Sequence, residues 1–383
     1  MKIGWILISI LYRVYPITVI DWLLLQIKGE FNLGLVYVHY LELDQNLWIL
    51  NAITEYKSMS QILKIREKAS GAIRRILLPE AEKDLRVIKA SIQLKNLNLV
   101  EPVLLGDSEK IEKLCHSAGI TFPNSIEIYP YRNKDDRDKK FIFFKEKMAH
   151  KNPTDEQINQ MCENELFTAG WLLKTGFAHG SVAGSVASTS EVIVAALRTV
   201  GISENSSLVS SSFLMEMPDG RVFTYADCAV VPYPTSDQLA SIAIDSGLTH
   251  KRLTGEDPRI AFLSFSTKGS ARHESVTLVK EAYLKAKKMG DWSMDGELQF
   301  DTALIPTIAA TKAPGSTLKG DASVFIFPNL DAGNIAYKIT ERLAGAVATG
   351  PVLQGLNSPF MDLSRGCSVD DIINTACVCA LLN

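Results

Sequence analysis

Apolar and polar positions from Met59 onwards alternate between short apolar runs and longer stretches with a helical period. The apolar runs predict strands at 74–81, 99–107, 180–185, 207–217, 222–231, 259–267 and 322–330. The helical stretches lie at 82–97, 108–118, 155–176, 189–200, 235–250, 274–289, 331–344 and 369–382, and a short amphipathic helix precedes the first strand. This alternation is typical of an α/β protein with largely parallel sheets and flanking helices.

Two polar breaks divide this pattern. The first is "RTVGISENSS" around Gly201, and the second is the Gly- and Pro-rich stretch "ATGPVLQGLNSP" at 348–359. A chain of 383 residues is long enough for two domains, each with its own core. We therefore expect a first domain of residues 59–200 plus 353–383, with a second domain of residues 201–352 inserted into it.

The predicted strand ends carry small and polar residues. Ligands of parallel sheets bind beyond the carboxyl ends of the strands, and here those ends read "PEAEKD", "GSVAGSVAST", "SFSTKGS" and "FPNLDAGN". "SFSTKGS" combines hydroxyls, a lysine and a glycine, as an anion site would, although an ordinary solvated turn uses the same residues. It lacks the spacing of a P-loop.

Composition narrows the class of protein. An apolar content of 46% with 22% charged residues is typical of a soluble globular chain, and the net charge of -3 argues against a broad nucleic-acid surface. The six cysteines form no CxxC pair, and no HExxH motif occurs, so we expect no metal site. A reducing cytoplasm fits this cysteine usage best.

The first 58 residues are apolar but interrupted by Arg13, Asp21 and Lys28. A membrane span needs roughly 20 mostly apolar residues without such charges, and no signal-peptide cleavage site follows. A membrane anchor or targeting segment is one interpretation. We favour an extension that adds little to function, with Met59 as the functional beginning.

The stretch "DLSRGCSVDD" at 362–371 is the densest in reactive side chains. Ser368 followed by Asp371 has the spacing of a helix N-cap, and acidic residues favour the positive end of the helix dipole. Capping explains neither Ser364 nor Arg365, and an arginine at a helix N-terminus suits a bound anion better than the helix itself. From the residues alone, a helix cap and an active site are equally good interpretations.

From Leu77 to the C-terminus, the chain resembles the phosphate acetyl/butyryl transferase family, and within it phosphate acetyltransferases. The resemblance is carried, in order, by "LLPEAEKDLRVIKA", "YADCAVVPYPTSDQLASIAI", "RIAFLSFSTKGSA", "DGELQFDTALIP", "KAPGS", "FPNLDAGNIAYKI" and "GPVLQGLNSPFMDLSRGCSVDDI". It implies reversible transfer of an acetyl group between acetyl phosphate and coenzyme A, with coenzyme A as a substrate and no metal or other cofactor. It also implies a cytoplasmic homodimer of two α/β domains with the active site in the cleft between them, related to isocitrate and isopropylmalate dehydrogenases.

The resemblance assigns site residues as well. The catalytic serine, arginine and acid of the family fall on Ser364, Arg365 and Asp371, and its neighbouring thiol falls on Cys367. We expect further substrate contacts from the opposite domain. These are Ser266, Thr267, Lys268 and Ser270.

Three positions depart from the family pattern. Val194 and Met148 stand where many members carry an arginine, and Met361 stands where an amide is frequent; Arg198, one turn after Val194, is a candidate replacement. Besides an acetyltransferase, we therefore consider a butyryl- or propionyltransferase and a catalytically weakened acyl-CoA or acyl-phosphate binding protein. A metal- and nucleotide-dependent dehydrogenase is disfavoured, because no dinucleotide fingerprint occurs.

Overall fold

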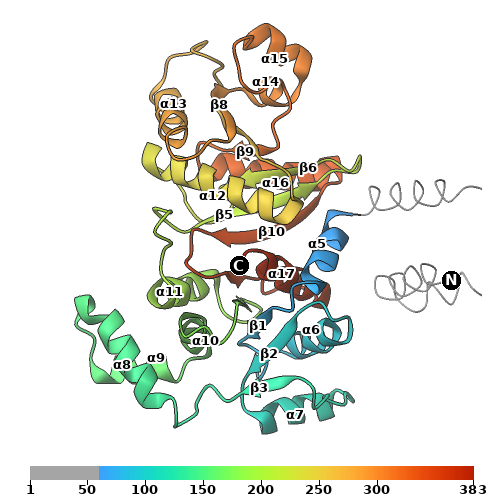
Figure 1. Ribbon diagram of the computed structural model, residues 1–383, viewed down its shortest axis with the longest axis vertical. Coiled ribbons are helices and arrows are strands. Elements are labelled where there is room, and N and C mark those ends of the chain that lie inside the picture. The colour runs from blue at the N-terminus through green and yellow to red at the C-terminus, as the bar shows by residue number, and fades with distance from the viewer. Residues whose placement is uncertain (1–59) are drawn as a thin grey trace, which may run out of the picture.

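The computed structural model describes residues 60–383, so our expectations for residues 1–58 lie outside the described part of the chain. Within residues 60–383, every helix is too short or too polar to cross a bilayer. The described chain forms two sheets with helices on their faces, placed one above the other in Figure 1. The α/β class predicted from the sequence is confirmed.

The first sheet is entirely parallel, with the order β11-β4-β1-β2-β3. Its strands are β1 (Arg75–Leu78), β2 (Glu101–Leu105), β3 (Glu127–Tyr129), β4 (Gly180–Ala183) and β11 (Phe360–Asp362). Successive side chains of a strand point to opposite faces. Accordingly Ile76 and Leu78 of β1 join one buried cluster, and Leu77 joins another on the opposite face.

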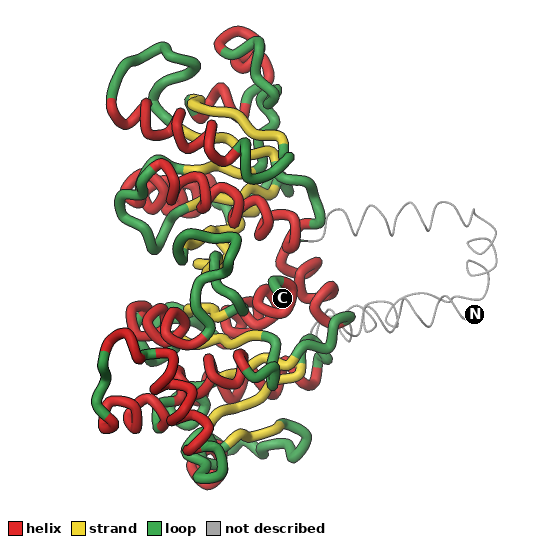
Figure 2. Tube along the Cα trace, turned by 60° about the vertical axis from the view of Figure 1, so that its left-hand side comes forward, coloured by secondary structure: helices red, strands yellow, loops and turns green. Residues whose placement is uncertain are grey.

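Helices cover both faces of this sheet, which explains why its strands are apolar without alternation. One face packs against α5 (Gln61–Ser70), α6 (Leu85–Asn96), α7 (Ser108–Ser117) and α17 (Val369–Leu381). The other packs against α8 (Arg137–Lys147), α9 (Asp155–Cys162), α10 (Glu165–Lys174) and α11 (Thr189–Thr199), with a short 3-10 turn at Ala149–Lys151. The first and last described helices, α5 and α17, lie side by side (Figure 2).

The second sheet is mixed, with the order β10-β5-β6-β9-β7-β8. Its strands are β5 (Ser210–Glu216), β6 (Val222–Ala226), β7 (Arg259–Leu263), β8 (Ser293–Leu298), β9 (Val324–Ile326) and β10 (Val347–Gln354), and β5 is antiparallel to both β10 and β6. Its helices are α12 (Ser236–Thr254), α13 (Glu274–Ala286), α14 (Phe300–Leu304), α15 (Pro306–Lys312) and α16 (Leu330–Ala344). The prediction of largely parallel sheets therefore holds for the first sheet and only in part for the second.

One sequence expectation is wrong in detail. The helix predicted at 155–176 is broken, because Asn164 accepts hydrogen bonds from the N–H groups of Leu166 and Phe167 and starts α10 anew. The predicted break at 348–359 contains β10, an edge strand with an irregular register between Thr349 and Val352, where a proline is tolerated. The chain leaves one sheet and enters the other over residues 355–359, and the two-domain division itself stays a prediction.

Candidate active site

The carboxyl ends of β1, β4 and β11 meet at one edge of the first sheet, because these strands are parallel neighbours. The backbones beyond β4 and β11 are in direct contact: Leu363 N–H donates to the Ala183 carbonyl at 2.7 Å. Gly184 has a φ of +102°, and a Cβ there would collide with Asp362 Oδ1 and lie 2.6 Å from the Leu363 carbonyl oxygen. Only glycine allows this approach.

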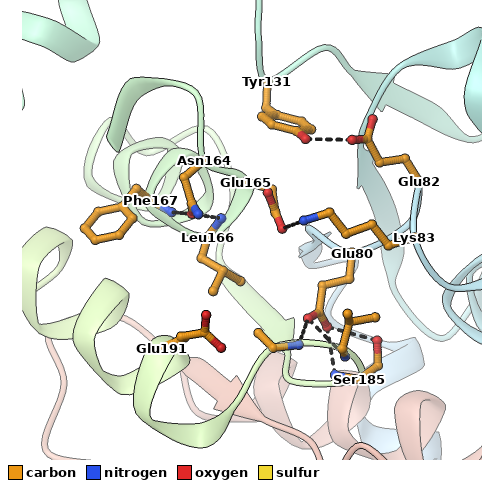
Figure 3. A network of polar contacts seen from close by, with 12 residues as sticks. Glu80, Glu82, Lys83, Tyr131, Asn164, Glu165, Leu166, Phe167, Ser185 and Glu191 are labelled. Atoms are coloured by element: carbon orange, nitrogen blue, oxygen red, sulfur yellow. Dashed lines mark hydrogen bonds and ion pairs between the residues drawn. The ribbon is translucent and has the colours of Figure 1, made fainter. Parts of the chain in front are cut away.

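A buried carboxylate shapes the loop after β4. Glu80, only 2% exposed, follows β1 and accepts hydrogen bonds from the backbone N–H groups of residues 184–187, at 2.6–3.1 Å, and from the Ser185 hydroxyl at 2.9 Å (Figure 3). Lys83, nearby in the same segment, pairs with Glu165 at the start of α10. The loop at residues 184–187, which contains Gly184, therefore folds around the buried carboxylate of Glu80.

The turn after β11 leads directly into α17. Ser368 caps that helix: its hydroxyl accepts from Asp371 N–H at 3.1 Å, and Asp371 Oδ2 accepts from the Ser368 N–H and hydroxyl at 2.8 Å each. The predicted cap is confirmed as a reciprocal capping box. The Asp371 carboxylate therefore has a structural role in the described chain.

Two adjoining cavities open beside this turn. The larger, about 380 Å³, is lined from the first-sheet side by Ser364, Cys367 and Asp371, and from the second-sheet side by residues of α16 and β10 that include Arg342 and Thr349. The smaller, about 270 Å³, is lined by Ala187, Thr189, Pro351, Asp362, Leu363, Ser364 and Arg365. Asp362, Leu363 and Ser364 line both cavities. The structure thus brings Ser364, Arg365, Cys367 and Asp371 together.

Arg365 is exposed, and among residues 60–383 its guanidinium has no hydrogen-bond or ion-pair partner. Glu191, in the first turn of α11, has a lowered pKa. Hydrogen bonds from Ser188 are the chief cause, and the positive charges of Lys83 and Arg365 lower the pKa to a lesser extent. Arg365 and the N-terminal turn of α11 line the same small cavity, through Ala187 and Thr189. An unpaired arginine beside a helix N-terminus is suited to hold an anion.

Asp362 is a buried acid that the sequence analysis did not single out as a site residue. It is 4% exposed; Oδ2 accepts from the Thr189 hydroxyl at 2.6 Å, and Oδ1 has no hydrogen-bond partner within the described residues. Burial is the main cause that raises its pKa from 3.8 to about 6, and the negative charge of Glu80 adds to this. A carboxyl group of this kind can exchange a proton near neutral pH.

Known proteins resemble this chain over most of its length. The family model of phosphate acetyl/butaryl transferase matches residues 60–380. The chain belongs to this family. A phosphate acetyltransferase of Thermoanaerobacterium thermosaccharolyticum is 40% identical over 329 residues, which is 84% of this chain and 99% of that protein, and one of Staphylococcus aureus is 40% identical over 328 residues, covering 84% and 98%.

Solved structures support the same family. A phosphotransacetylase from Staphylococcus aureus superposes with a TM-score of 0.78 and one from Streptococcus pyogenes with 0.79; each is 39% identical and covers 84% of this chain and 97% of the other. A branched-chain phosphotransacylase from Enterococcus faecalis, 18% identical with a TM-score of 0.60, shares the fold. The family assignment made from the sequence motifs is confirmed.

Cys367 is 6% exposed and lines the larger cavity. Burial is the main cause that raises its pKa above the ordinary thiol value, while Arg86 opposes the shift. Because the thiolate is the nucleophilic form, a neutral thiol agrees with the expected role of a neighbour. All six cysteines lie in the described residues and are free and buried.

The "SFSTKGS" loop follows β7 in the second sheet and lines neither of the two cavities. Its polar groups are already engaged: Ser266 Oγ and Gly269 N–H donate to Glu297 Oε1 at 3.1 and 2.6 Å, and Lys268 pairs with Asp295. Both acids are 2% exposed. A phosphate at this loop would have to compete with two buried carboxylates.

The remaining sequence-predicted residues lie apart from the cavity linings. Arg198 is in the last turn of α11 and partly buried, Val194 of the same helix is 37% exposed, and Met148 is buried at the end of α8. In residues 60–383 no group of three His, Cys, Asp or Glu side chains could hold a metal ion.

Three relevant residues were not predicted: Glu80, Arg86 and Asp362. The signal for Glu80 and Asp362 was their position at or just after a strand end, whereas Arg86 lies in the first turn of α6 and had no such signal.

Proposed function

We propose that this protein is a phosphate acetyltransferase, which transfers an acetyl group reversibly between acetyl phosphate and coenzyme A. The observation that carries the proposal is Arg365, an exposed cation without a partner in the described chain, which lines a cavity together with a hydroxyl and a helix N-terminus. The curated relatives with 40% identity carry this activity in their names. The family assignment and the site thus support the same chemistry.

We infer direct transfer in a ternary complex. The coenzyme A sulfur attacks the carbonyl carbon of acetyl phosphate, a C–S bond forms, and the C–O bond to phosphate breaks, so that phosphate leaves with the bonding electrons. Arg365 would neutralise the phosphate or the developing oxyanion, and Ser364 would donate a hydrogen bond to the same transition state. Cys367 would remain a neighbour, because direct transfer needs no acyl-enzyme.

The thiol proton needs an acceptor. We assign this role to Asp371, as the resemblance implies. In reference conditions transfer from a thiol of pKa near 8.5 to a carboxylate near 4 is uphill by roughly 6 kcal/mol. Asp362, whose pKa is about 6, lines the same cavity and would reduce that difference to roughly 3 kcal/mol. Asp362 is therefore a second candidate acceptor.

The active site is proposed to lie between the two predicted domains. In support, the larger cavity is lined by α16 and β10 on one side and by the Ser364 turn and α17 on the other. Ser266, Thr267, Lys268 and Ser270 stay proposed phosphate contacts from the second domain, and Arg198 a proposed substitute for the arginine replaced by Val194. The relation to isocitrate and isopropylmalate dehydrogenases also stays a prediction.

We propose that the functional unit is a cytoplasmic homodimer. In support, α16 buries only Gly333 and presents Ile335, Ile339 and Leu343, which are 57%, 52% and 84% exposed and spaced by one helical turn. Large exposed apolar stripes on soluble proteins mark interaction surfaces. Leu343→Asp should shift the mass measured by light scattering from dimer to monomer; a monomeric wild-type protein would contradict the proposal.

One assay tests the proposed function. Phosphate-dependent release of coenzyme A is measured with acetyl-CoA, and again with butyryl-CoA and propionyl-CoA, in the presence of a chelator. We expect turnover with acetyl-CoA that survives chelation. Preference for the larger acyl groups would favour a butyryl- or propionyltransferase, and binding without turnover would favour the weakened homologue suggested by Val194 and Met148.

A further inference from the structure

Arg86, in the first turn of α6, reaches both loops of the candidate site with one guanidinium group. Nη1 donates to the Arg365 carbonyl at 3.0 Å and to the Cys367 carbonyl at 2.6 Å. Nη2 donates to the Ser185 carbonyl at 3.0 Å. The turn after β11 and the loop after β4 are therefore tied to the same side chain.

Asp84, the N-cap residue of α6, fixes the orientation of that guanidinium. Its carboxylate accepts from Arg86 Nε at 3.1 Å to each oxygen and from Nη2 at 2.7 Å, and its Oδ1 also accepts from Arg86 N–H at 2.8 Å. A guanidinium has five N–H donors, and Asp84 together with the three carbonyls occupies all of them. Arg86 consequently has no donor left for a substrate.

The turn that contains Arg365, residues 364–367, also has hydrogen bonds within itself. Cys367 N–H donates to the Ser364 carbonyl at 2.9 Å, and Gly366 N–H donates to Ser364 Oγ at 3.2 Å. These bonds define the shape of the turn, whereas Arg86 joins the carbonyl groups of the turn to helix α6. In the neighbouring loop, Glu80 binds the N–H groups of residues 184–187. Arg86 thus binds carbonyl groups of both loops, and Glu80 binds N–H groups of the loop after β4.

We propose that Arg86 is a positioning residue for the transfer reaction, which holds the backbone of Arg365 and Cys367 at a fixed place relative to the loop at residues 184–187. This inference rests on the proposed function of Arg365. The Arg365 side chain is exposed, so the place of its guanidinium depends on its backbone. A displacement of about 1 Å at a reacting centre can cost roughly 100-fold in rate.

Arg86→Lys tests the proposal, because an ammonium keeps the charge but cannot bind Asp84 and three carbonyls in one plane. We expect kcat to fall roughly 10- to 100-fold, with the KM for phosphate raised by a smaller factor, because misplacement acts mainly in the transition state. Combined with Arg365→Gln, the same substitution should lower kcat by less than about threefold. Equal losses in both backgrounds would show that Arg86 does not act through Arg365, and an unchanged kcat in Arg86→Lys would also overturn the proposal.

Arg75→Lys is the matched control. Arg75 begins β1, its side chain is 32% exposed against 34% for Arg86, and it pairs with Glu127 instead of a site loop. Its substitution should leave kcat unchanged. If Arg86→Lys does not fold, Asp84→Asn removes the carboxylate that orients Arg86 and should lower kcat by a smaller factor, again only while Arg365 is present; an unaltered kcat there would contradict the proposal.

A protein that lacks the proposed function would give a different result from one in which Arg86 has no positioning role. A wild-type protein that releases no coenzyme A from acetyl-CoA in phosphate would refute the function. Phosphate-induced stabilisation, measured as a shift in melting temperature, then tests Arg86 separately. We expect Arg86→Lys and Arg365→Gln each to reduce that shift and the double variant to reduce it no further, whereas an undiminished shift in Arg86→Lys would overturn the positioning role.

Discussion

Replacement of Asp362 by asparagine should stabilise the protein while it weakens the enzyme. Asp362 is buried, its Oδ1 has no partner within the described residues, and its pKa is about 6 instead of 3.8. In the folded protein at pH 8 this carboxylate is held ionised in a site that favours its protonated form. Asparagine is of similar shape and removes the charge.

The magnitude follows from the pKa difference between the folded and unfolded states. About two pKa units at 1.36 kcal/mol each give a cost of up to about 3 kcal/mol at pH 8. Because the folded pKa is raised, the cost falls as the pH falls through 6 and vanishes below the unfolded pKa. At pH 5 about half of it, roughly 1.5 kcal/mol, should remain.

Thermal unfolding at pH 8 and pH 5 measures this effect. Asp362→Asn should raise the melting temperature by roughly 3–6 °C at pH 8 and by about half as much at pH 5. Its kcat should fall at least about tenfold if the carboxyl group takes part in proton transfer. No gain at pH 8, or an equal gain at both pH values, would show that the buried charge of Asp362 does not destabilise the protein.

Two further acids serve as controls. Asp245 is also buried with a pKa raised to about 6 by burial, but it lines neither cavity, so Asp245→Asn should gain stability with the same pH dependence and keep its kcat. Asp257 is exposed and paired with Lys251, which lowers its pKa, so Asp257→Asn should bring no gain. A loss of activity in Asp245→Asn would show that the effect of Asp362 is not specific to the site.

Four other predictions concern the same region. Arg365→Gln should lower kcat roughly 100-fold, as expected for the loss of one transition-state donor, and a near-normal rate would disprove the assignment. Gly184→Ala should destabilise the protein by roughly 1–3 kcal/mol in denaturant unfolding, because an alanine must adopt a φ of +102° against Leu363; an unaltered unfolding midpoint would contradict this. Ser368→Ala should cost about 1 kcal/mol through the lost cap of α17, again read from the unfolding midpoint. Deletion of residues 1–58 should leave kcat intact, and an inactive or insoluble product would show that the extension matters.

The sequence predicted the site where the chain is locally regular. The Ser368 and Asp371 spacing gave the start of α17, and the polar strand ends led to the edge of the first sheet, because parallel strands bring their carboxyl ends together. β11 escaped notice because three residues are too few for a period. Asp362 therefore went unassigned, although it lines both cavities.

Contacts between residues far apart in the sequence could not be predicted from the periodicity of the chain. Arg86 is 279 positions from Arg365, and Glu80 is more than 100 positions from the loop that it organises, so no periodicity could join them. For the "SFSTKGS" loop, the sequence suggested a site but did not show that other residues compete for it. Its residues suit an anion, but Asp295 and Glu297, which come from another strand, already occupy its donors.

Steady-state release of coenzyme A from acetyl-CoA, in the presence and absence of phosphate, decides whether the protein is a phosphate acetyltransferase. We expect turnover that requires phosphate, yields acetyl phosphate in equal amount to coenzyme A, exceeds that with butyryl-CoA and falls roughly 100-fold in Arg365→Gln. A purified wild-type protein that binds acetyl-CoA but forms no acetyl phosphate would contradict this expectation.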